Sequence, residues 1–586
     1  MSVYPLWQAE VLEESAEEIQ RKREELEAEV DACCEVRGPY RNKVKKFLEI
    51  QEIWHISEID YQVRVKYEKF LETEVVPASR STYLKGFDRI KQHSIREQMQ
   101  TLAGRRNNIL RFDNQILFLP YHPDQEIAVQ FDNAVKKDEL VWDFSRTASE
   151  TMKRQIFMAL HFIINHYLNK KTRRRNLLAL RKFYDFCVND HIEDIEKLEL
   201  RQIQKFKESL SGRQEQEATM CVVDISRKAV FLEEDEIHWD ANVWYLERFH
   251  FESTRINPAS PVLSLSFAEV THIENRRLLQ QYMKYGLGIT HLSISNLREE
   301  LTMVRRFLKW LDGRMDISED VCGIGSGTIE DYFQSRGESG IKDDSYNLEV
   351  MAVLHFFDYL RVKGKIEKIP FHKEYYLKKT FPKHHDRSVA EKVHMEILGK
   401  LHCFPEELRL MFLHLWGIGL RASEVCTLKG DAYYVQGRDA WIQVYQVKMK
   451  TYKRIPIPAV LYKLMKVFMK KYGIEAEDYV FQNKKGGAYV YGTLRARMIR
   501  YCNESHIAGG EYLFQSHAYR HTVATVFYDS GVSIQGVRDY LGHEYEEMTR
   551  QYIDYMPKKI SKANEEYFSE PENSLGSGIK RCKRGG

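Results

Sequence analysis

The sequence predicts a mostly α-helical protein of several domains, ending in a domain of helices with a small β-sheet. At 586 residues the chain is too long for one hydrophobic core, so about three to five domains are expected. Apolar residues recur at helical spacing through most of the chain. The alternating stretch Ala440–Val447, followed after a short turn by Lys453–Ile457, is instead typical of a β-hairpin.

Composition argues against a membrane, secreted or zinc-binding protein, but it does not show whether the chain binds nucleic acid. The net charge is only +3, so a surface that binds nucleic acid has to be local. No apolar run approaches 18 residues, and no secretory signal pattern opens the chain, so we expect no membrane span. Nine cysteines without a C-x-x-C pair indicate a reduced, cytoplasmic protein. Histidines and cysteines do not cluster at the spacing of zinc ligands, so no metal is expected.

The first region, residues 1–150, shows no recognisable chemistry. Its charged stretch 9–31 has Leu12, Ile19 and Leu26 at seven-residue intervals, which predicts a short coiled-coil-like helix. A solvated helix that packs on its own domain fits the pattern equally well, and both interpretations stay open.

Residues 151–212 form a predicted basic helical unit. Between Lys153 and Lys182, nine residues are Lys or Arg and none is Asp or Glu. Apolar residues in this stretch keep helical spacing, with basic residues at its start and on the other face. Such a run is often only a solvated face, but this one is unopposed, which favours contact with DNA. The residues concerned are Arg173, Arg174, Arg175, Arg181 and Lys182.

A related pattern returns in a second helical region, residues 268–365. Arg181-Lys182-Phe183 is matched there by Arg305-Arg306-Phe307, so residues 151–212 are interpreted as a second, partial copy. Arg305 and Arg306 join the predicted DNA-binding residues on this ground.

Three segments are expected to lack a core of their own. Residues 213–267 contain strand-like and irregular sequence and are interpreted as a connector. Residues 366–387 are basic, punctuated by proline and poor in periodicity, which is typical of an interdomain linker. The Gly- and Ser-containing segment 568–586 is predicted to be a disordered basic tail.

Residues that suit one chemistry gather toward the C-terminus. Two arginines, two histidines, a lysine and a tyrosine can hold a phosphodiester, attack it with a phenol and protonate the leaving alcohol. They are Arg421, Lys448, His517, Arg520, His543 and Tyr552.

Local patterns support several of these assignments. Arg421 follows two glycines at an expected helix start, where its planar guanidinium can take two phosphate oxygens and Glu424 can hold it in place. His517 and Arg520 are three residues apart at the start of a helix, so both face one side. A free phenol has a pKa near 10 and therefore needs nearby positive charge to attack.

Five pieces in this region also carry a family resemblance. GLR-x-x-E with TLK, a basic hairpin ending in IPIP, H-x-x-R-H, LGH, and a tyrosine nine residues later occur in that order. Together they resemble the catalytic domain of the tyrosine recombinases, the phage-integrase and Xer-type family, over about residues 384–567. The resemblance implies a catalytic domain at 388–567 and a helical, SAM-like core-binding domain at 268–365.

The resemblance also implies a role for each residue. Lys448, eight residues before Pro456, would give a proton to the leaving 5′-oxygen, with Lys450 as the alternative. His543 would hydrogen-bond the phosphate. Tyr552 would form a 3′-phosphotyrosyl link without metal or other cofactor, and Tyr555, twelve residues after that histidine, is the second choice.

The sequence therefore predicts a site-specific recombinase, the integrase or transposase of a mobile element. The family implies a homotetramer on two double-stranded DNA sites, with room for accessory proteins encoded by the element. The alternatives are a type IB topoisomerase-like relaxer, which acts alone, and a DNA-binding relative without catalysis. The presence of all six residues argues against the last.

Overall fold

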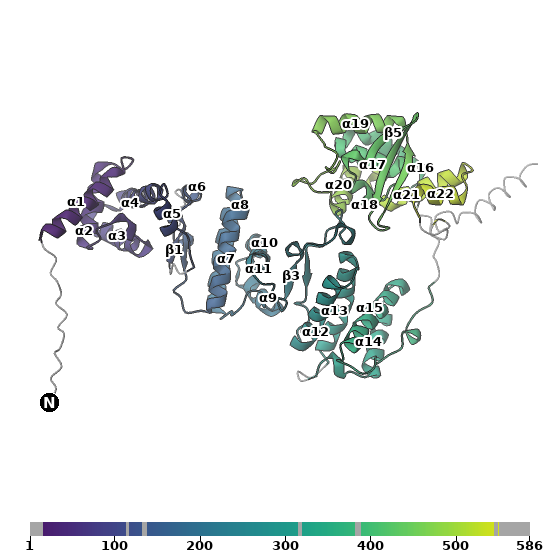
Figure 1. Cartoon of the computed structure of the whole chain (residues 1–586), viewed down its shortest axis with the longest axis horizontal. Coiled ribbons are helices and arrows are strands. Elements are labelled where there is room, and N and C mark those ends of the chain that lie inside the picture. The colour runs from purple at the N-terminus through teal and green to yellow at the C-terminus, as the bar shows by residue number, and fades with distance from the viewer. Residues whose placement is uncertain are drawn as a thin grey trace, which may run out of the picture. The chain divides into compact units, whose positions relative to one another are not determined.

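The computed structural model confirms the mostly α architecture with small sheets. The chain divides into two compact units, Met1–Tyr245 and Leu246–Gly586, which are described separately (Figure 1). None of the described helices is both long and apolar enough to cross a membrane. The structure describes residues 16–112, 116–131, 137–314, 319–380, 388–543 and 549.

The first unit opens with a helical bundle. Leu26 and Val30 of the first helix are fully buried in its core, whereas Ile19 is exposed. The second half of this helix therefore packs on its own domain, which is the second of the two interpretations; Leu12 lies outside the described residues. The elements are α1 (Ala16–Ala32), α2 (Gly38–Ile50), η1 (Ile56–Glu58), α3 (Tyr61–Glu74), α4 (Pro77–Gln98) and α5 (Leu102–Asn107).

A second helical group completes this unit. Strand β1 (Ile116–Phe118) pairs antiparallel with β2 (Val141–Asp143). Helices α7 and α8 pack on each other and on α11. Between the strands lie η2 (Leu119–Tyr121), α6 (Gln125–Ala128), η3 (Val129–Phe131) and η4 (Lys137–Leu140); after them come α7 (Glu150–His166), α8 (Lys170–Asn189), α9 (Leu200–Ser209), α10 (Arg213–Thr219), α11 (Cys221–Glu233) and β3 (Val243–Tyr245).

One expectation for this region was wrong. Residues 213–267 were interpreted as a connector of strand-like and irregular sequence, but residues 213–233 form α10 and α11. The β-branched residues of α11, such as Val222 and Val230, resemble a strand in sequence. They are fully buried in the structure, so packing outweighs their local preference.

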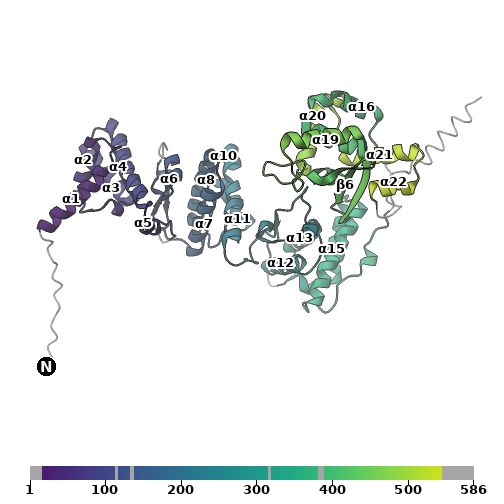
Figure 2. The same cartoon turned by 45° about the horizontal axis from the view of Figure 1, so that its top comes forward.

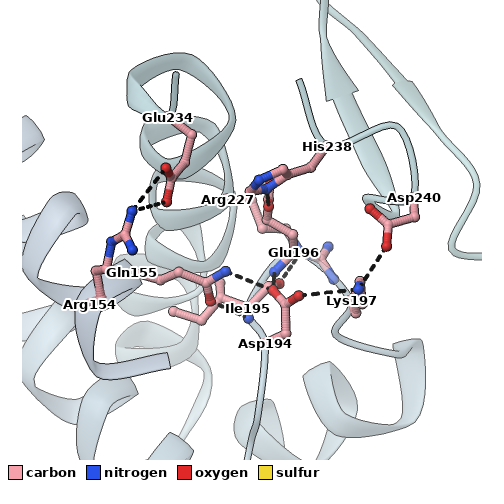
Figure 3. Close-up of polar contacts among 10 residues, drawn as sticks. All are labelled: Arg154, Gln155, Asp194, Ile195, Glu196, Lys197, Arg227, Glu234, His238 and Asp240. Carbon is pink, nitrogen blue, oxygen red and sulfur yellow. Dashed lines mark hydrogen bonds and ion pairs between the residues drawn. The ribbon is translucent and has the colours of Figure 1, made fainter. Parts of the chain in front are cut away.

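Polar contacts fix the loop between α8 and α9, as Figure 3 shows. Gln155 of α7 accepts from the backbone N–H of Ile195 at 2.7 Å and donates to Asp194 at 2.8 Å. Burial raises the pKa of the Glu196 carboxyl to about 7, against the opposing effect of its hydrogen bond to His238. These contacts join the loop to α7 through Gln155 and to the segment before β3 through His238. They therefore stabilise the position of the loop in the fold.

The second unit begins with a helical domain in which α13 packs on α12 and α15. The Glu349 carboxylate, almost fully buried, accepts hydrogen bonds from Arg306, Arg336 and Tyr332. The elements are η5 (Leu246–Arg248), η6 (Ser253–Arg255), β4 (Ser264–Ser266), α12 (Ile273–Gly288), α13 (Ile294–Asp312), η7 (Val321–Gly323), α14 (Ser326–Glu338), α15 (Asp343–Val362) and η8 (Lys373–Tyr375).

The C-terminal domain surrounds an antiparallel sheet of order β5-β6-β7 with helices (Figure 2). The expected hairpin is present, with β6 and β7 paired from Ala440–Ile457 to Gln446–Thr451. The elements are α16 (Glu391–Lys400), η9 (Leu401–Cys403), α17 (Glu406–Ile418), α18 (Ala422–Cys426), η10 (Gly430–Ala432), β5 (Tyr433–Gln436), β6 (Asp439–Gln446), β7 (Thr451–Ile457), α19 (Ala459–Tyr472), α20 (Tyr491–Glu504), η11 (Ile507–Gly510), α21 (Ser516–Asp529) and α22 (Ile534–Leu541).

The segment before β4 contacts both domains of the second unit. Ala259 is fully buried in the core of the C-terminal domain, and its carbonyl accepts from the N–H of Tyr491 at 2.7 Å. Arg255 donates to the carbonyls of Gly286 and Leu287 at the end of α12. This part of the predicted connector is therefore fixed to two domains by specific contacts.

Candidate active site

Arg421 owes its position to the turn between α17 and α18. Gly419 has φ +65°, which favours glycine, and an added Cβ there would lie 3.1 Å from the side chain of Val523. The turn places Arg421 immediately before α18. Its backbone N–H and its Nη1 donate to the two oxygens of Glu424, at 2.9 and 2.8 Å. Glu424 thus holds the guanidinium in the expected way.

Arg520 reaches the same place from α21. Its guanidinium is fully buried and donates through Nη1 to the carbonyl of Gly419 at 2.9 Å. Nη2 donates to the carbonyl of Leu541 at the end of α22. Because Gly419 is two residues before Arg421, the structure brings together two arginines that are about a hundred residues apart in sequence.

His543 enters the cluster directly after α22. The helix ends at Gly542, whose φ is +68°, and His543 is buried beside Thr549, with Nδ1 3.0 Å from Oγ1. Burial, together with the charges of Arg520 and Arg421, lowers the pKa of His543 to about 3. The imidazole is therefore neutral at physiological pH and can offer a phosphate oxygen one N–H.

Lys453 is a member of the site that sequence reasoning missed. Its side chain is 6% exposed, and Nζ lies 3.0 Å from Glu424 Oε2. Nζ also donates to the carbonyl of Leu541 at 3.3 Å. The signal was available in the alternation of β7, because Lys453 shares the inward face with Ile455 and Ile457.

The other predicted residues differ in their placement. Lys448 and Lys450 are exposed in the turn between β6 and β7. His517 is exposed one turn before Arg520, and it contributes to the lowered pKa of His543. Tyr552 and Tyr555 lie outside the described residues.

The charge of the cluster is its main chemical property. Three cations lie around one carboxylate, Glu424: Arg520 and Lys453 are buried, and Arg421 is partly buried. Burial alone would raise the pKa of Glu424, but Lys453, Arg520 and Arg421 outweigh it and lower the pKa to about 2. Within this set the cations outnumber the carboxylate, which suits an anion with several oxygens, such as a phosphodiester. The described residues contain no cluster suited to a metal ion.

Several predicted DNA-binding residues are engaged within the protein. Arg174 and Arg175 are exposed at the start of α8. Arg173 is instead buried, because it lies on the packed stripe of this helix, and it donates to the Tyr167 carbonyl and to Gln130. The remaining four pair with carboxylates: Arg181 with Asp185, Lys182 with Glu215, Arg305 with Glu269 and Arg306 with Glu349.

Comparison with known proteins agrees with this geometry. Residues 389–559 match the phage integrase family. The C-terminal domain belongs to this family of tyrosine recombinases. The match spans Arg421, Arg520 and His543, and it extends past the described residues to include Tyr552.

Two curated relatives were found among others. Transposase B from transposon Tn554 of Staphylococcus aureus (strain N315) is 28% identical over 328 residues, which cover 54% of this chain and 51% of that protein. Tyrosine recombinase XerA of Thermococcus onnurineus (strain NA1) is 26% identical over 226 residues, or 39% of this chain and 76% of that protein. The chain thus spans about half the length of the transposase.

Two solved structures are similar to part of this chain. XerH site-specific recombinase bound to palindromic difH substrate is 16% identical, with a TM-score of 0.39, covering 51% of this chain and 91% of that chain. The Tn1549 transposon integrase in complex with transposon right end DNA is 17% identical, with a TM-score of 0.37, covering 50% and 98%.

The Glu424 cluster yields a first testable prediction. With its pKa lowered from 4.5 to about 2, Glu424 stabilises the fold above pH 4.5, and this contribution is lost as the pH falls toward 2. Glu424→Gln should therefore cost about 3 kcal/mol at pH 7. We expect the amides of α17 and α18 to exchange about 100-fold faster in hydrogen exchange.

Glu407→Gln provides the matched control, because that carboxylate is more exposed and pairs with Arg497. Its exchange should stay within about threefold of the parent. Equal exchange in the parent and in Glu424→Gln would mean that the cluster does not stabilise this part of the fold.

Proposed function

We propose that this protein is a site-specific DNA recombinase that acts as the transposase or integrase of a mobile element. The observation that carries the proposal is that Arg421 and Lys453 converge on the carboxylate of Glu424. Lys453 and Arg520 also share the carbonyl of Leu541, two residues before His543. A buried set of groups with excess positive charge has little structural advantage of its own, and it is suited to stabilise negative charge on a reacting phosphate.

The chemistry follows from these groups. Arg421 and Arg520 bind the nonbridging oxygens of the scissile phosphate, and neutral His543 donates a hydrogen bond. The phenol of Tyr552 loses its proton to water, its oxygen attacks phosphorus, and the bond to the 5′-oxygen breaks. The departing 5′-oxygen takes a proton from Lys448, with Lys450 as the alternative. The phosphodiester is conserved as a 3′-phosphotyrosyl link, so a second 5′-hydroxyl can reverse the step without a cofactor.

The proposed partner is double-stranded DNA, held by a homotetramer on two sites. The named relatives include a transposase and recombinases, and structures of similar fold contain DNA, which supports this choice. Accessory proteins of the element and action in the cytoplasm belong to the same proposal. A type IB topoisomerase-like relaxer is the alternative; relaxation at one site without strand exchange would identify it.

We further propose that the second helical group of the first unit is a copy of the helical domain in the second unit. In both, a short strand precedes two long helices, and β4, α12 and α13 begin 123 or 124 residues after β2, α7 and α8. Helix α15 likewise begins 122 residues after α11, so the proposed copy extends beyond residues 151–212, to β2 and α11.

DNA contact by this group is proposed at the start of α8. Lys170, Lys171, Arg174 and Arg175 are exposed there, and none has an ion-pair partner among the described residues. These side chains can reach phosphates without breaking an internal pair, unlike Arg181 and Lys182.

Replacement of Tyr552 tests the nucleophile. Tyr552→Phe should abolish covalent capture of a nicked DNA duplex. The duplex carries the repeat sequence found at the ends of the element, in the DNA that flanks the gene. Gel-shift affinity should stay within about threefold, because phosphate contacts elsewhere supply the binding. Tyr555→Phe is the matched control. Capture that persists in Tyr552→Phe and is lost in Tyr555→Phe would move the nucleophile.

Replacement of the two arginines tests the phosphate site. Arg421→Ala and Arg520→Ala should each slow capture by about 10²–10³-fold, which is the usual effect of losing one oriented donor. Lysine should rescue neither, since it lacks the two-donor guanidinium. Gel shifts run beside the cleavage assay separate binding from chemistry. An alanine variant that cleaved at the parental rate would assign that arginine a purely structural role.

Charge removal at α8 tests the proposed DNA contact. Arg174→Ala with Arg175→Ala should weaken binding and reduce the log–log salt slope by about 0.9 for each phosphate that the protein no longer neutralises. The control is Lys182→Ala, whose ammonium already pairs with Glu215. A salt slope equal to the parent's in the double variant would show that this face is only solvated.

A further inference from the structure

Lys453 occupies an unusual position for a lysine. It lies on the inward face of β7, where its neighbours on the same face, Ile455 and Ile457, are buried in the hydrophobic core. Removal of an ammonium group from water is costly unless partners compensate it. Two partners do so here, the Glu424 carboxylate at 3.0 Å and the Leu541 carbonyl at 3.3 Å.

The first partner links Lys453 to Arg421. Glu424 uses Oε1 to hold the guanidinium of Arg421, and Oε2 to accept from the backbone of Arg421 and to pair with Lys453. The orientation of the carboxylate is therefore set from both sides. Without Lys453, Oε2 would keep only the backbone N–H, and Glu424 could rotate together with Arg421.

The second partner links Lys453 to Arg520 and His543. The Leu541 carbonyl also accepts from Arg520, and Gln446 donates to the next carbonyl, that of Gly542, at 3.0 Å. Gln446 ends β6, and Lys453 is in β7. Both strands of the hairpin thus hold the two residues that precede His543.

We propose that Lys453 is a positioning residue of the cleavage site, which fixes Arg421 through Glu424 and fixes the segment before His543 through the Leu541 carbonyl. The proposal rests on the function proposed above and deepens it. Lys453 itself transfers no proton. Proton transfer stays with one of the exposed lysines of the hairpin turn, Lys448 or Lys450. Gln446 and Lys453 lie on either side of this turn and hold it against α22.

The charge of Lys453 should make this role dependent on pH. Four ionisable groups face it: Glu424 beside it, Arg421 before α18, Arg520 of α21 and His543 after α22. Burial and the two arginines, against the effect of Glu424, lower the pKa of Lys453 from 10.5 to about 8. The ammonium is charged below that pH and loses its proton above it, so its contact with Glu424 weakens as the pH rises.

The decisive experiment compares two leaving groups. Covalent capture is measured with the full chain on the nicked duplex, once with the normal 5′-oxygen and once with sulfur in that position. Sulfur leaves as a thiolate and needs no proton donor. Lys453→Met should slow capture at least about tenfold on both substrates, with gel-shift affinity within about threefold. Lys448→Met or Lys450→Met, whichever lysine donates the proton, should be slow on oxygen and rescued by sulfur.

Three outcomes overturn the proposal. Rescue of Lys453→Met by sulfur would make Lys453 the proton donor. The control is Lys463→Met, because Lys463 is exposed on α19. If Lys453→Met captured DNA as fast as this control, Lys453 would be only a packing residue. If Lys453→Met lost DNA affinity by the same factor as its rate of capture, the substitution would act on binding as a whole and not on the cleavage site. A parent protein that forms no covalent link on either substrate would instead overturn the proposed function.

Lys453→Arg keeps the test open if the methionine variant fails to fold. The guanidinium retains the charge next to Glu424 and does not titrate in the working range. In the parent, kcat/KM for capture should fall above about pH 8 because Lys453 loses its proton there. Lys453→Arg should lack this fall. If the fall persisted unchanged in that variant, Lys453 would not be the titrating group, and the proposal would be wrong.

Discussion

The buried carboxylate of Glu424 is the interaction on which the rest of the C-terminal domain's site depends. It is the single negative group described among three cations, and without it Arg421 and Lys453 would lie close together with no compensation. Its two oxygens also determine geometry, because one orients the Arg421 side chain and the other faces β7. A local i,i+3 pair at the start of α18 thereby becomes the junction of a helix and a sheet.

The same cluster explains why His543 can act as a neutral donor. Burial disfavours a protonated imidazole, and the positive charge of the neighbouring cations adds to this effect, so both lower the pKa of His543. The cations proposed to bind a phosphate therefore also help to keep the histidine neutral. The arginines lower the pKa of Glu424, and together with burial they also lower the pKa of Lys453.

The sequence was most informative where function depends on local order. The contact of Arg421 with Glu424 and the β6–β7 hairpin follow from short spacings, and both are present. Lys453 was missed because its importance arises from strand register and from Leu541, some ninety residues away. Arg173 was placed on a surface because its charge dominated the interpretation, whereas helix packing buries it. Residues 213–233 show the same limit, because burial turns a strand-like composition into helix.

The distribution of charge explains how a protein of net charge +3 can be suited to DNA. Arg181, Lys182, Arg305 and Arg306 are all neutralised by carboxylates nearby, so their number says little about binding. Among the described residues, exposed positive charge without an ion pair is found instead at the start of α8, and cations outnumber the one carboxylate around Glu424. The first group is exposed, and there water and salt weaken each contact. The second is buried, so a single phosphate gains more from it than from many surface lysines. The proposed DNA binding and the proposed catalysis thus make different demands on charge, and different groups of residues suit each.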